Sequence, residues 1–398
     1  MGDLVHEFDK PRLYWEKIKF IGVLMCRFLQ KGLEWIPIKR NRISMISLTH
    51  RGYGDNLKYL TEYLKKAGKY EIAWITRYPE TCDEIKGVKL IKAKTFEHLT
   101  WQFTSNILFS DDYLYMTLIK RKKQTYINTW HGGINYKNVG YEGMLFETPF
   151  QEKRFAVQNV KPEYMVAGSR FFEKNMRAAF RLHNTQFLRT GLPRNDILYW
   201  ENEELKKGVR EKLGLENKKV LLYAPTFRNT ELRDNLFGFD CKRILGALEE
   251  RYGGDWVVLY RAHYFVDSNF ELEADNVKNV SNYSDMQELL LISDYMISDY
   301  SSCMWDFLLV GKPCIVYAPD YGRYCQNDRG LTEAGRDMPY PVTANMEELT
   351  EVIKKYNTDS EREKNKRHLE KMGSYDKGTA LKKIGYLVEK ICTQGGTV

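Results

Sequence analysis

The chain has 398 residues, about two to three times the size of a common single domain, and this length predicts two domains. Hydrophobic residues make up 43% of it and aromatic residues 14%, which is enough to form packed cores and excludes a fibrous or disordered protein. The formal net charge is +8, and most of that excess lies between residues 10 and 42, where nine residues are basic and two are acidic.

Residues 12–36 are predicted to form an amphipathic helix within a segment that spans residues 1–40. At about 100° per residue, apolar residues fall on one face and charged residues on the other. The apolar face comprises Ile18, Ile21, Met25, Phe28, Leu29 and Ile36. The basic polar side suits a helix lying on an anionic membrane surface, and docking on the protein's own core is an alternative that periodicity leaves open.

Apolar runs typical of strands alternate with helical stretches after residue 42, which predicts parallel α/β sheets. The first series of strands covers 43–48, 71–76, 88–91, 106–109, 125–130 and 164–167, and the second covers 219–224, 256–260, 277–280, 295–298 and 313–317. The charged stretch 201–219 lies between them. The sequence therefore predicts an α/β protein with two doubly wound halves, residues 41–205 and 206–398, and a cleft between them as the default site.

Four unusual segments directly follow predicted strands, where open α/β sheets bind their ligands. In the first, Trp130 ends a strand, His131 occupies the turn, and Gly132 and Gly133 let the backbone approach an anion closely. His131 is therefore a candidate acid or base. The alternative is a structural histidine in a tight turn.

The second and third segments lie in the second half of the chain. Pro225 and Thr226 follow an apolar strand, and Thr226 offers a hydroxyl group and a backbone amide to a ligand. Arg261 and His263 fall on the same side of an extended strand end, which places a cation beside a titratable imidazole. A buried arginine paired with a carboxylate is the simpler interpretation of Arg261.

The fourth segment places Ser301 and Ser302 at the start of a predicted helix. Free amides and the positive end of the helix dipole can hold a phosphate there, although N-capping by serine explains the same pattern. Asp306 lies on the same helical face as Ser302 and could reach a hydroxyl group of the ligand. A capping or solvated aspartate is the alternative.

Several motifs do not occur in the sequence. It contains no GxxxxGK[ST], no GxGxxG after a strand and no Asp-x-Asp, so a P-loop NTPase and a dinucleotide oxidoreductase are disfavoured, and we predict no cofactor and no obligatory metal. The seven scattered cysteines form no CxxC pair, which favours a reducing compartment. We recognise neither a membrane-spanning run nor a secretory signal, and expect a cytoplasmic protein that binds no nucleic acid.

Taken in order, these segments resemble the CDP-glycerol glycerophosphotransferase family, the primases and polymerases that build teichoic acids and related capsule polymers. The resemblance covers the chain from about Asn41 onward. Its motifs are Trp130-His131-Gly132, Gly191-Leu-Pro-Arg-Asn-Asp196, Ala224-Pro-Thr226, Arg261-Ala-His263 and Asp299-Tyr-Ser-Ser-Cys-Met-Trp-Asp306. The segment Gly52-Tyr-Gly-Asp-Asn-Leu-Lys58 is also similar to a family segment, with Leu57 in place of proline.

The resemblance implies a GT-B fold, in which two Rossmann-like domains face a cleft. It implies transfer of glycerol phosphate from CDP-glycerol to a hydroxyl group of a lipid-linked, undecaprenyl-type acceptor, with release of CMP, by a peripheral enzyme on the cytoplasmic face of the cell membrane. His131 and His263 are the catalytic candidates. The candidates for substrate binding are Trp130, Gly132, Gly133, Arg194, Pro225, Thr226, Arg261, Ser301, Ser302 and Asp306.

Such a transfer requires a base for the acceptor hydroxyl and groups that stabilise phosphate charge. His131 is the preferred base, and the sequence leaves open whether it or His263 removes the proton. Three alternatives remain: a transferase of the same fold that uses CDP-ribitol or a nucleotide sugar, a non-catalytic membrane-bound binding protein, and a nucleic-acid-binding protein.

Overall fold

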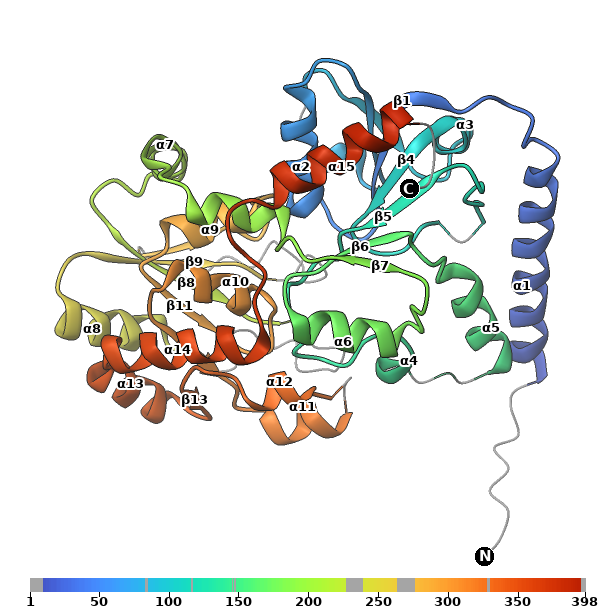
Figure 1. The fold of residues 1–398 in the computed structure, drawn as a ribbon. Coiled ribbons are helices and arrows are strands. Elements are labelled where there is room, and N and C mark those ends of the chain that lie inside the picture. The colour runs from blue at the N-terminus through green and yellow to red at the C-terminus, as the bar shows by residue number, and fades with distance from the viewer. Residues whose placement is uncertain are drawn as a thin grey trace, which may run out of the picture.

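The computed structural model describes residues 10–82, 85–115, 117–144, 146, 148–226, 239–262, 276–327 and 330–394. Two parallel sheets form two halves that lie side by side (Figure 1). The predicted α/β class with two sheets is confirmed. His263 and the stretch that follows it to residue 275 lie outside the described residues.

The first sheet has seven strands in the order β3-β2-β1-β4-β5-β6-β7. They are β1 (Lys39–Ser47), β2 (Glu71–Thr76), β3 (Lys89–Lys92), β4 (Ser105–Ser110), β5 (Thr125–Asn128), β6 (Tyr164–Val166) and β7 (Gln186–Leu188). The helical elements of this half are α1 (Lys10–Lys31), α2 (Asp55–Lys65), η1 (Pro79–Thr81), α3 (Phe96–Thr104), α4 (Gly140–Gly143), α5 (Pro149–Gln158) and α6 (Arg170–Ala179).

The second sheet has six strands in the order β10-β9-β8-β11-β12-β13. They are β8 (Lys219–Ala224), β9 (Trp256–Tyr260), β10 (Val277–Asn279), β11 (Tyr295–Ser298), β12 (Cys314–Tyr317) and β13 (Val342–Thr343). The remaining helical elements are η2 (Pro193–Tyr199), α7 (Glu203–Leu213), α8 (Cys241–Tyr252), α9 (Met286–Ile292), α10 (Cys303–Val310), α11 (Tyr321–Asn327), α12 (Glu333–Arg336), α13 (Met346–Lys355), α14 (Thr358–Met372) and α15 (Ala380–Gln394).

All eleven predicted strands are present. The central ones stand out in the sequence because strands covered by helices on both faces are continuous apolar runs. The residues of β4, β5, β9, β11 and β12 are buried throughout. The edge strands β7 and β13, of three and two residues, were not predicted, since so short a segment shows no periodicity.

The last helix packs on the first half of the chain. Leu381, Ile384, Val388 and Ile391 of α15 join the core formed around β1 and α2, and Figure 1 shows α15 lying beside α2. Asp196 of η2 fixes its start, because its carboxylate accepts the amides of Ala380 and Leu381 at 3.0 and 2.9 Å. The predicted boundary at residue 205 assigns α15 to the second half, but α15 packs in the core of the first half.

The helix α1 docks on the first half through one stripe of residues. The stripe comprises Glu16, Phe20, Val23, Arg27 and Gln30. Two of its side chains bond to main-chain carbonyls, Arg27 to Val157 at 3.0 Å and Gln30 to Thr117 at 2.6 Å. These bonds fix the rotation of the helix, so its opposite face points away from the protein.

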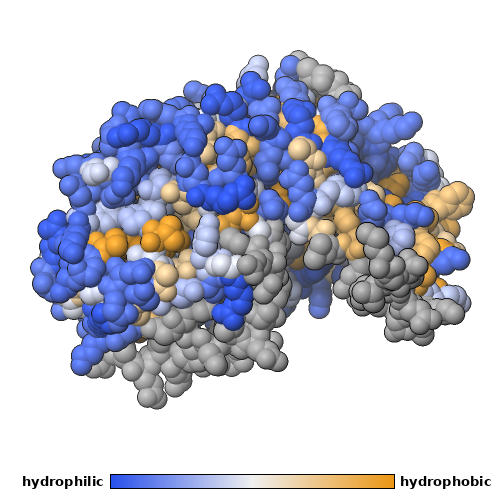
Figure 2. All heavy atoms as spheres, turned by 90° about the horizontal axis from the view of Figure 1, so that it is seen from below, coloured by the Kyte–Doolittle hydropathy of each residue, from blue (hydrophilic) through white to orange (hydrophobic). Residues whose placement is uncertain are grey.

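That opposite face is apolar. It consists of Tyr14, Ile18, Ile21, Met25, Phe28 and Leu29, which are 40% to 73% exposed and are called the α1 apolar face below. In Figure 2, hydrophobic residues gather at the right-hand edge, the side on which Figure 1 places α1. Five of the six residues predicted for the apolar face are in this exposed set. For these five, the alternative in which the face docks on the protein's own core is therefore wrong. The sixth, Ile36, follows the helix and is half-buried.

No helix among the described residues is long and apolar enough to span a bilayer.

We expect Ile384→Ala to lower the free energy of unfolding by about 2–5 kcal/mol, because it deletes a fully buried side chain that joins α15 to the first half. Tyr386→Ala on the same helix is the matched control, since Tyr386 is 71% exposed, and should change stability by no more than about 0.5 kcal/mol. Chemical denaturation measures both. Equal effects would contradict the docking of α15.

Candidate active site

His131 lies in a sharp turn directly after β5, as predicted. Trp130 has φ +51°, a left-handed conformation that is uncommon for a residue with a side chain and is held here by its neighbours. Asn56 donates from Nδ2 to the Trp130 carbonyl at 2.9 Å, and Asn128 accepts the Trp130 amide at 2.7 Å. The Trp130 ring stacks on His131 with centroids 4.5 Å apart. Backbone and ring of His131 are thus fixed before any ligand binds.

The hydrogen bond of His131 determines which ring nitrogen is basic. Nδ1 lies 2.9 Å from the main-chain carbonyl oxygen of Asp111. A carbonyl can only accept, so Nδ1 carries the proton and Nε2 carries the lone pair. Burial lowers the pKa of His131 to about 4, and the charge of His50 acts in the same direction. At neutral pH, His131 is therefore an uncharged imidazole that can accept a proton.

The two glycines after His131 let the turn pack against the second half. A Cβ on Gly133 would lie 2.6 Å from Nε1 of Trp305 in α10, closer than the indole allows. A Cβ on Gly132 would lie 3.4 Å from Cβ of Ser302, the residue at the start of α10. The His131 turn therefore lies against the Ser301–Ser302 helix start, and that helix start provides the partial positive charge that favours phosphate.

The other candidates in the second half lie at the carboxyl ends of neighbouring strands. Thr226 follows β8, and its amide donates to both carboxylate oxygens of Asp299, at 2.9 and 3.0 Å, just after β11. Arg261 follows β9, and its Nη1 donates to the Tyr283 carbonyl at 2.5 Å. Pro225 is half-buried beside Thr226. These groups thus share one sheet edge with Ser301. His263 lies outside the described residues, so its place relative to them stays a prediction.

Arg194 and Asp306, both predicted to bind the donor, are buried and paired with each other. Nη2 of Arg194 lies 2.7 Å from Oδ2 of Asp306, and Nη1 lies 2.7 Å from Oδ2 of Asp55. Nη1 also donates to the main-chain carbonyl of His131 at 3.1 Å. Asp306 is 1% exposed, and burial raises its pKa although Arg194 opposes that shift. By this geometry, the Arg194–Asp306 pair joins the two halves at the His131 turn. Donor binding by either residue stays a prediction.

Further polar contacts cross between the halves around this pair. Asn195 donates to Oδ1 of Asp306 at 3.0 Å and accepts from Nε2 of Gln287 at 3.3 Å. Lys58 of α2 pairs with Asp285 and with Glu288 of the second half. The segment before α2 approaches so closely that a Cβ on Gly54 would lie 2.4 Å from the carbonyl oxygen of Ser284. The halves are therefore fixed to each other along one side of the site.

The sequence interpretation missed two groups beside His131. His50 follows β1 and Asp111 follows β4, and their side chains are 3.1 Å apart beneath the His131 turn. The rule that identified His131, namely a polar residue just after a parallel strand, also applies to these two positions.

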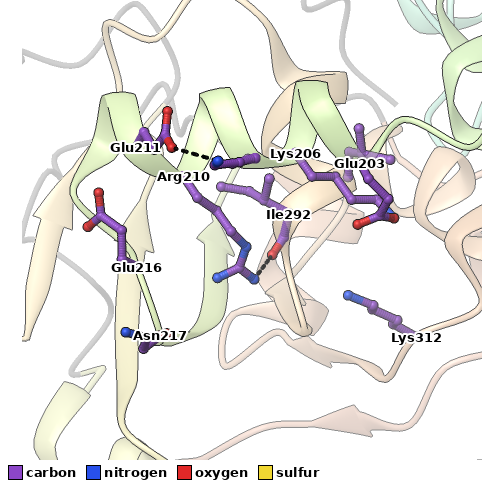
Figure 3. Close-up of a pocket in the computed structure, with 10 residues that line it drawn as sticks. Glu203, Lys206, Arg210, Glu211, Glu216, Asn217, Ile292 and Lys312 are labelled. Atoms are coloured by element: carbon purple, nitrogen blue, oxygen red, sulfur yellow. Dashed lines mark hydrogen bonds and ion pairs between the residues drawn. The ribbon is translucent and has the colours of Figure 1, made fainter.

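A separate cavity of about 420 Å3 lies beside α7, away from these groups (Figure 3). Its lining is mostly charged and partly paired within itself, since Lys206 pairs with Glu203 and Lys207 with Glu211. It contains none of the predicted site residues. Among the described residues no group of three or more potential metal ligands is placed together, and metal independence stays a prediction.

Comparison with known proteins shows the family of this chain. A family model described as CDP-Glycerol:Poly(glycerophosphate) glycerophosphotransferase matches residues 30–390. The chain belongs to this family. The predicted family and its class of enzyme are thereby confirmed.

Two relatives from staphylococci are similar along most of this chain. The teichoic acid poly(glycerol phosphate) polymerase of Staphylococcus epidermidis is 30% identical over 89% of the chain, which spans about half, 51%, of that protein's length. The teichoic acid glycerol-phosphate transferase of Staphylococcus aureus is 30% identical over 81% of the chain and 86% of its own length.

A solved structure of the wall teichoic acid polymerase TagF, from a histidine variant soaked with CDPG, has a TM-score of 0.81 to this chain. The identity is 26%, over 96% of this chain and 98% of that one. The predicted GT-B arrangement of two Rossmann-like domains is confirmed by this match together with the two sheets.

We expect Arg194→Met to lower the free energy of unfolding by about 3–5 kcal/mol, because it leaves two buried carboxylates without their cation. Arg189→Met is the matched control. Arg189 pairs with Glu173 at the surface with 65% of its side chain exposed, and its loss should cost at most about 1 kcal/mol. Denaturant titration of both variants measures the difference, and similar values would refute the bridging function of Arg194.

Proposed function

We propose that this chain transfers glycerol phosphate from CDP-glycerol to a hydroxyl group of a lipid-linked acceptor and releases CMP, in the synthesis of teichoic acid or a capsule polymer. Family membership gives the class of reaction. The observation that carries the proposal is the geometry of His131, whose Nδ1–H is held by the Asp111 carbonyl and whose turn packs against the start of α10. A base and a phosphate-binding helix start are thus adjacent.

In the proposed reaction, Nε2 of His131 accepts the proton of the acceptor hydroxyl as its oxygen attacks the β-phosphorus of the donor. The bond from that phosphorus to the bridging oxygen breaks, and CMP leaves with the bonding electron pair. The amides at the start of α10 and the guanidinium of Arg261 stabilise charge on the phosphate groups. Ser301 and Ser302, both predicted to bind phosphate, supply hydroxyl groups along the same sheet edge. The amide of Thr226, the third such residue, is already donated to Asp299.

CDP-glycerol is the preferred donor because both relatives at 30% identity have names that refer to glycerol phosphate. The CDPG-soaked TagF structure supports the same choice. CDP-ribitol and a nucleotide sugar remain alternatives, since the groups around His131 are proposed to act on the reacting phosphate and none is assigned to the alditol. No cofactor is part of this proposal.

We also propose that the chain binds the cytoplasmic face of the cell membrane through the α1 apolar face. Six large apolar side chains point away from the protein on a helix whose other face is fixed by hydrogen bonds. Exposed lysines flank them, Lys17, Lys19 and Lys31, and these favour an anionic lipid surface. Such binding would bring the site to an acceptor anchored in the same membrane.

We expect the wild-type chain to release CMP from CDP-glycerol, and not from CDP-ribitol, when a lipid-linked acceptor or a glycerol phosphate primer is present. His131→Ala should lower this turnover by at least about a hundredfold, because it removes the base. His183→Ala is the control, since His183 is an exposed histidine, and should leave turnover unchanged. Turnover with CDP-ribitol or UDP-glucose alone would reject the donor, and wild-type turnover in His131→Ala would reject the mechanism.

We expect the double variant Ile21→Glu/Phe28→Glu to weaken binding to anionic vesicles by at least about tenfold, because burying each side chain in lipid contributes about 1.5–3 kcal/mol. Vesicle sedimentation measures it. Phe96→Glu/Tyr386→Glu is the control with the same change of charge, since these residues are 82% and 71% exposed outside α1. Vesicle binding that survives the α1 change, or an α1 face occupied by a second copy of the chain in solution, would refute the proposal.

A further inference from the structure

A second histidine lies beneath the proposed base. His50 follows β1 and Asp111 follows β4, and these strands pair in the middle of the first sheet. Nδ1 of His50 lies 3.1 Å from Oδ2 of Asp111, which also accepts the hydroxyl of Ser47 at 2.7 Å. Asp111 is fully buried, so its carboxylate is held in one position by these two contacts.

The same two residues contact His131 from below. The main-chain carbonyl of Asp111 lies 2.9 Å from Nδ1 of His131. The ring of His50 meets the ring of His131 edge to face, with centroids 5.5 Å apart and planes inclined by 68°. His131 is therefore bound through Asp111 at one nitrogen and faces His50 with its ring.

We propose that His50 and Asp111 are positioning residues for His131, in which Asp111 fixes the tautomer through its carbonyl and the His50–Asp111 ion pair places a positive charge against the base. This inference rests on the proposed function of His131. Neither residue needs to touch the substrate for this purpose. The pair anchors the base from two central strands of the sheet, whose positions are set by the core.

The charges around His50 support an imidazolium at neutral pH. Burial alone would lower the pKa of His50, but Asp111, Asp55 and Asp112 together raise it to about 9. Asp111 and Asp112 face it from the end of β4, and Asp55 faces it from the start of α2. Burial, with the charge of Asp111, raises the pKa of Asp112 itself to about 7, and Arg77 after β2 acts against that shift.

The imidazolium in turn keeps His131 neutral. Two adjacent rings cannot both be protonated without repulsion, so the charge on His50 adds to the burial that lowers the pKa of His131 to about 4. Asp55 and Asp111 act in the opposite direction. Arg194 donates to the carbonyl of His131 at 3.1 Å and is a further cation at this turn. Removing the charge of His50 should therefore raise the pKa of His131.

The test is the pH dependence of His50→Gln, which keeps a hydrogen-bonding side chain and removes the charge. We expect the acid limb of kcat/KM for CMP release to move up by at least about one pH unit relative to the wild type, because neighbouring charge at this separation shifts a pKa by about that amount. The ratio of wild-type to variant kcat/KM should therefore fall by at least about threefold between about pH 4 and pH 7, because the His131 pKa of the wild type is about 4. NMR titration of the His131 ring should give the same shift without any turnover.

Two variants separate this role from a merely structural one. His50→Lys restores a cation beside Asp111 and should return the acid limb and the His131 titration toward the wild-type midpoint. His183→Gln, at an exposed histidine, should move neither. An unchanged His131 titration in His50→Gln, or the same shift in His50→Lys, would overturn the inference. Absence of CMP release by the wild type would reject the proposed function, and the NMR titration would still decide the inference.

Discussion

The buried guanidinium of Arg194 is the interaction on which the site depends. It pairs with Asp55 at the start of α2 in the first half and with Asp306 of α10 in the second, and it holds the carbonyl of His131 between them. A planar, permanently charged fork suits two carboxylates better than an ammonium group would. Because both carboxylates are buried, the pair stabilises the structure only while all three groups are in place, and this couples the arrangement of the halves to the position of the proposed base.

The remaining features of the site follow from that arrangement. With the halves fixed along one side, the carboxyl edges of the two sheets face each other, and the Gly132–Gly133 turn fits directly against α10. Glycine is needed there for space, since Trp305 occupies the volume that a Cβ of Gly133 would fill. The left-handed conformation of Trp130, at φ +51°, is held by its hydrogen bonds with Asn56 and Asn128. The two edges thus bring the proposed base next to the start of α10, where free amides favour an anion.

The strands and the carboxyl-end position of His131 were predictable because parallel strands carry continuous apolar runs and their ligands bind at one edge. The sequence did not show which group each polar side chain contacts. Arg194 and Asp306 are more than a hundred residues apart, and nothing in their local motifs shows that each is the counterion of the other. His50 and Asp111 fit the same carboxyl-end rule, but only the pairing of β1 with β4 brings them together beneath His131. The place of α15 in the first core likewise depends on a contact made from the far end of the chain.

The N-terminal helix shows where periodicity stops being informative. Its apolar stripe was identified correctly, but a stripe gives no direction, and docking is decided by polar side chains on the other face. Arg27 and Gln30 bond to main-chain carbonyls, contacts that no side-chain pattern encodes. A helix held in this way exposes apolar surface at a cost of about 25 cal/mol per Å2 in water, and this cost is recovered only against an apolar partner. Because the attachment also fixes α1 relative to the sheet that carries His131, any surface that covered the α1 apolar face would also set the orientation of the site.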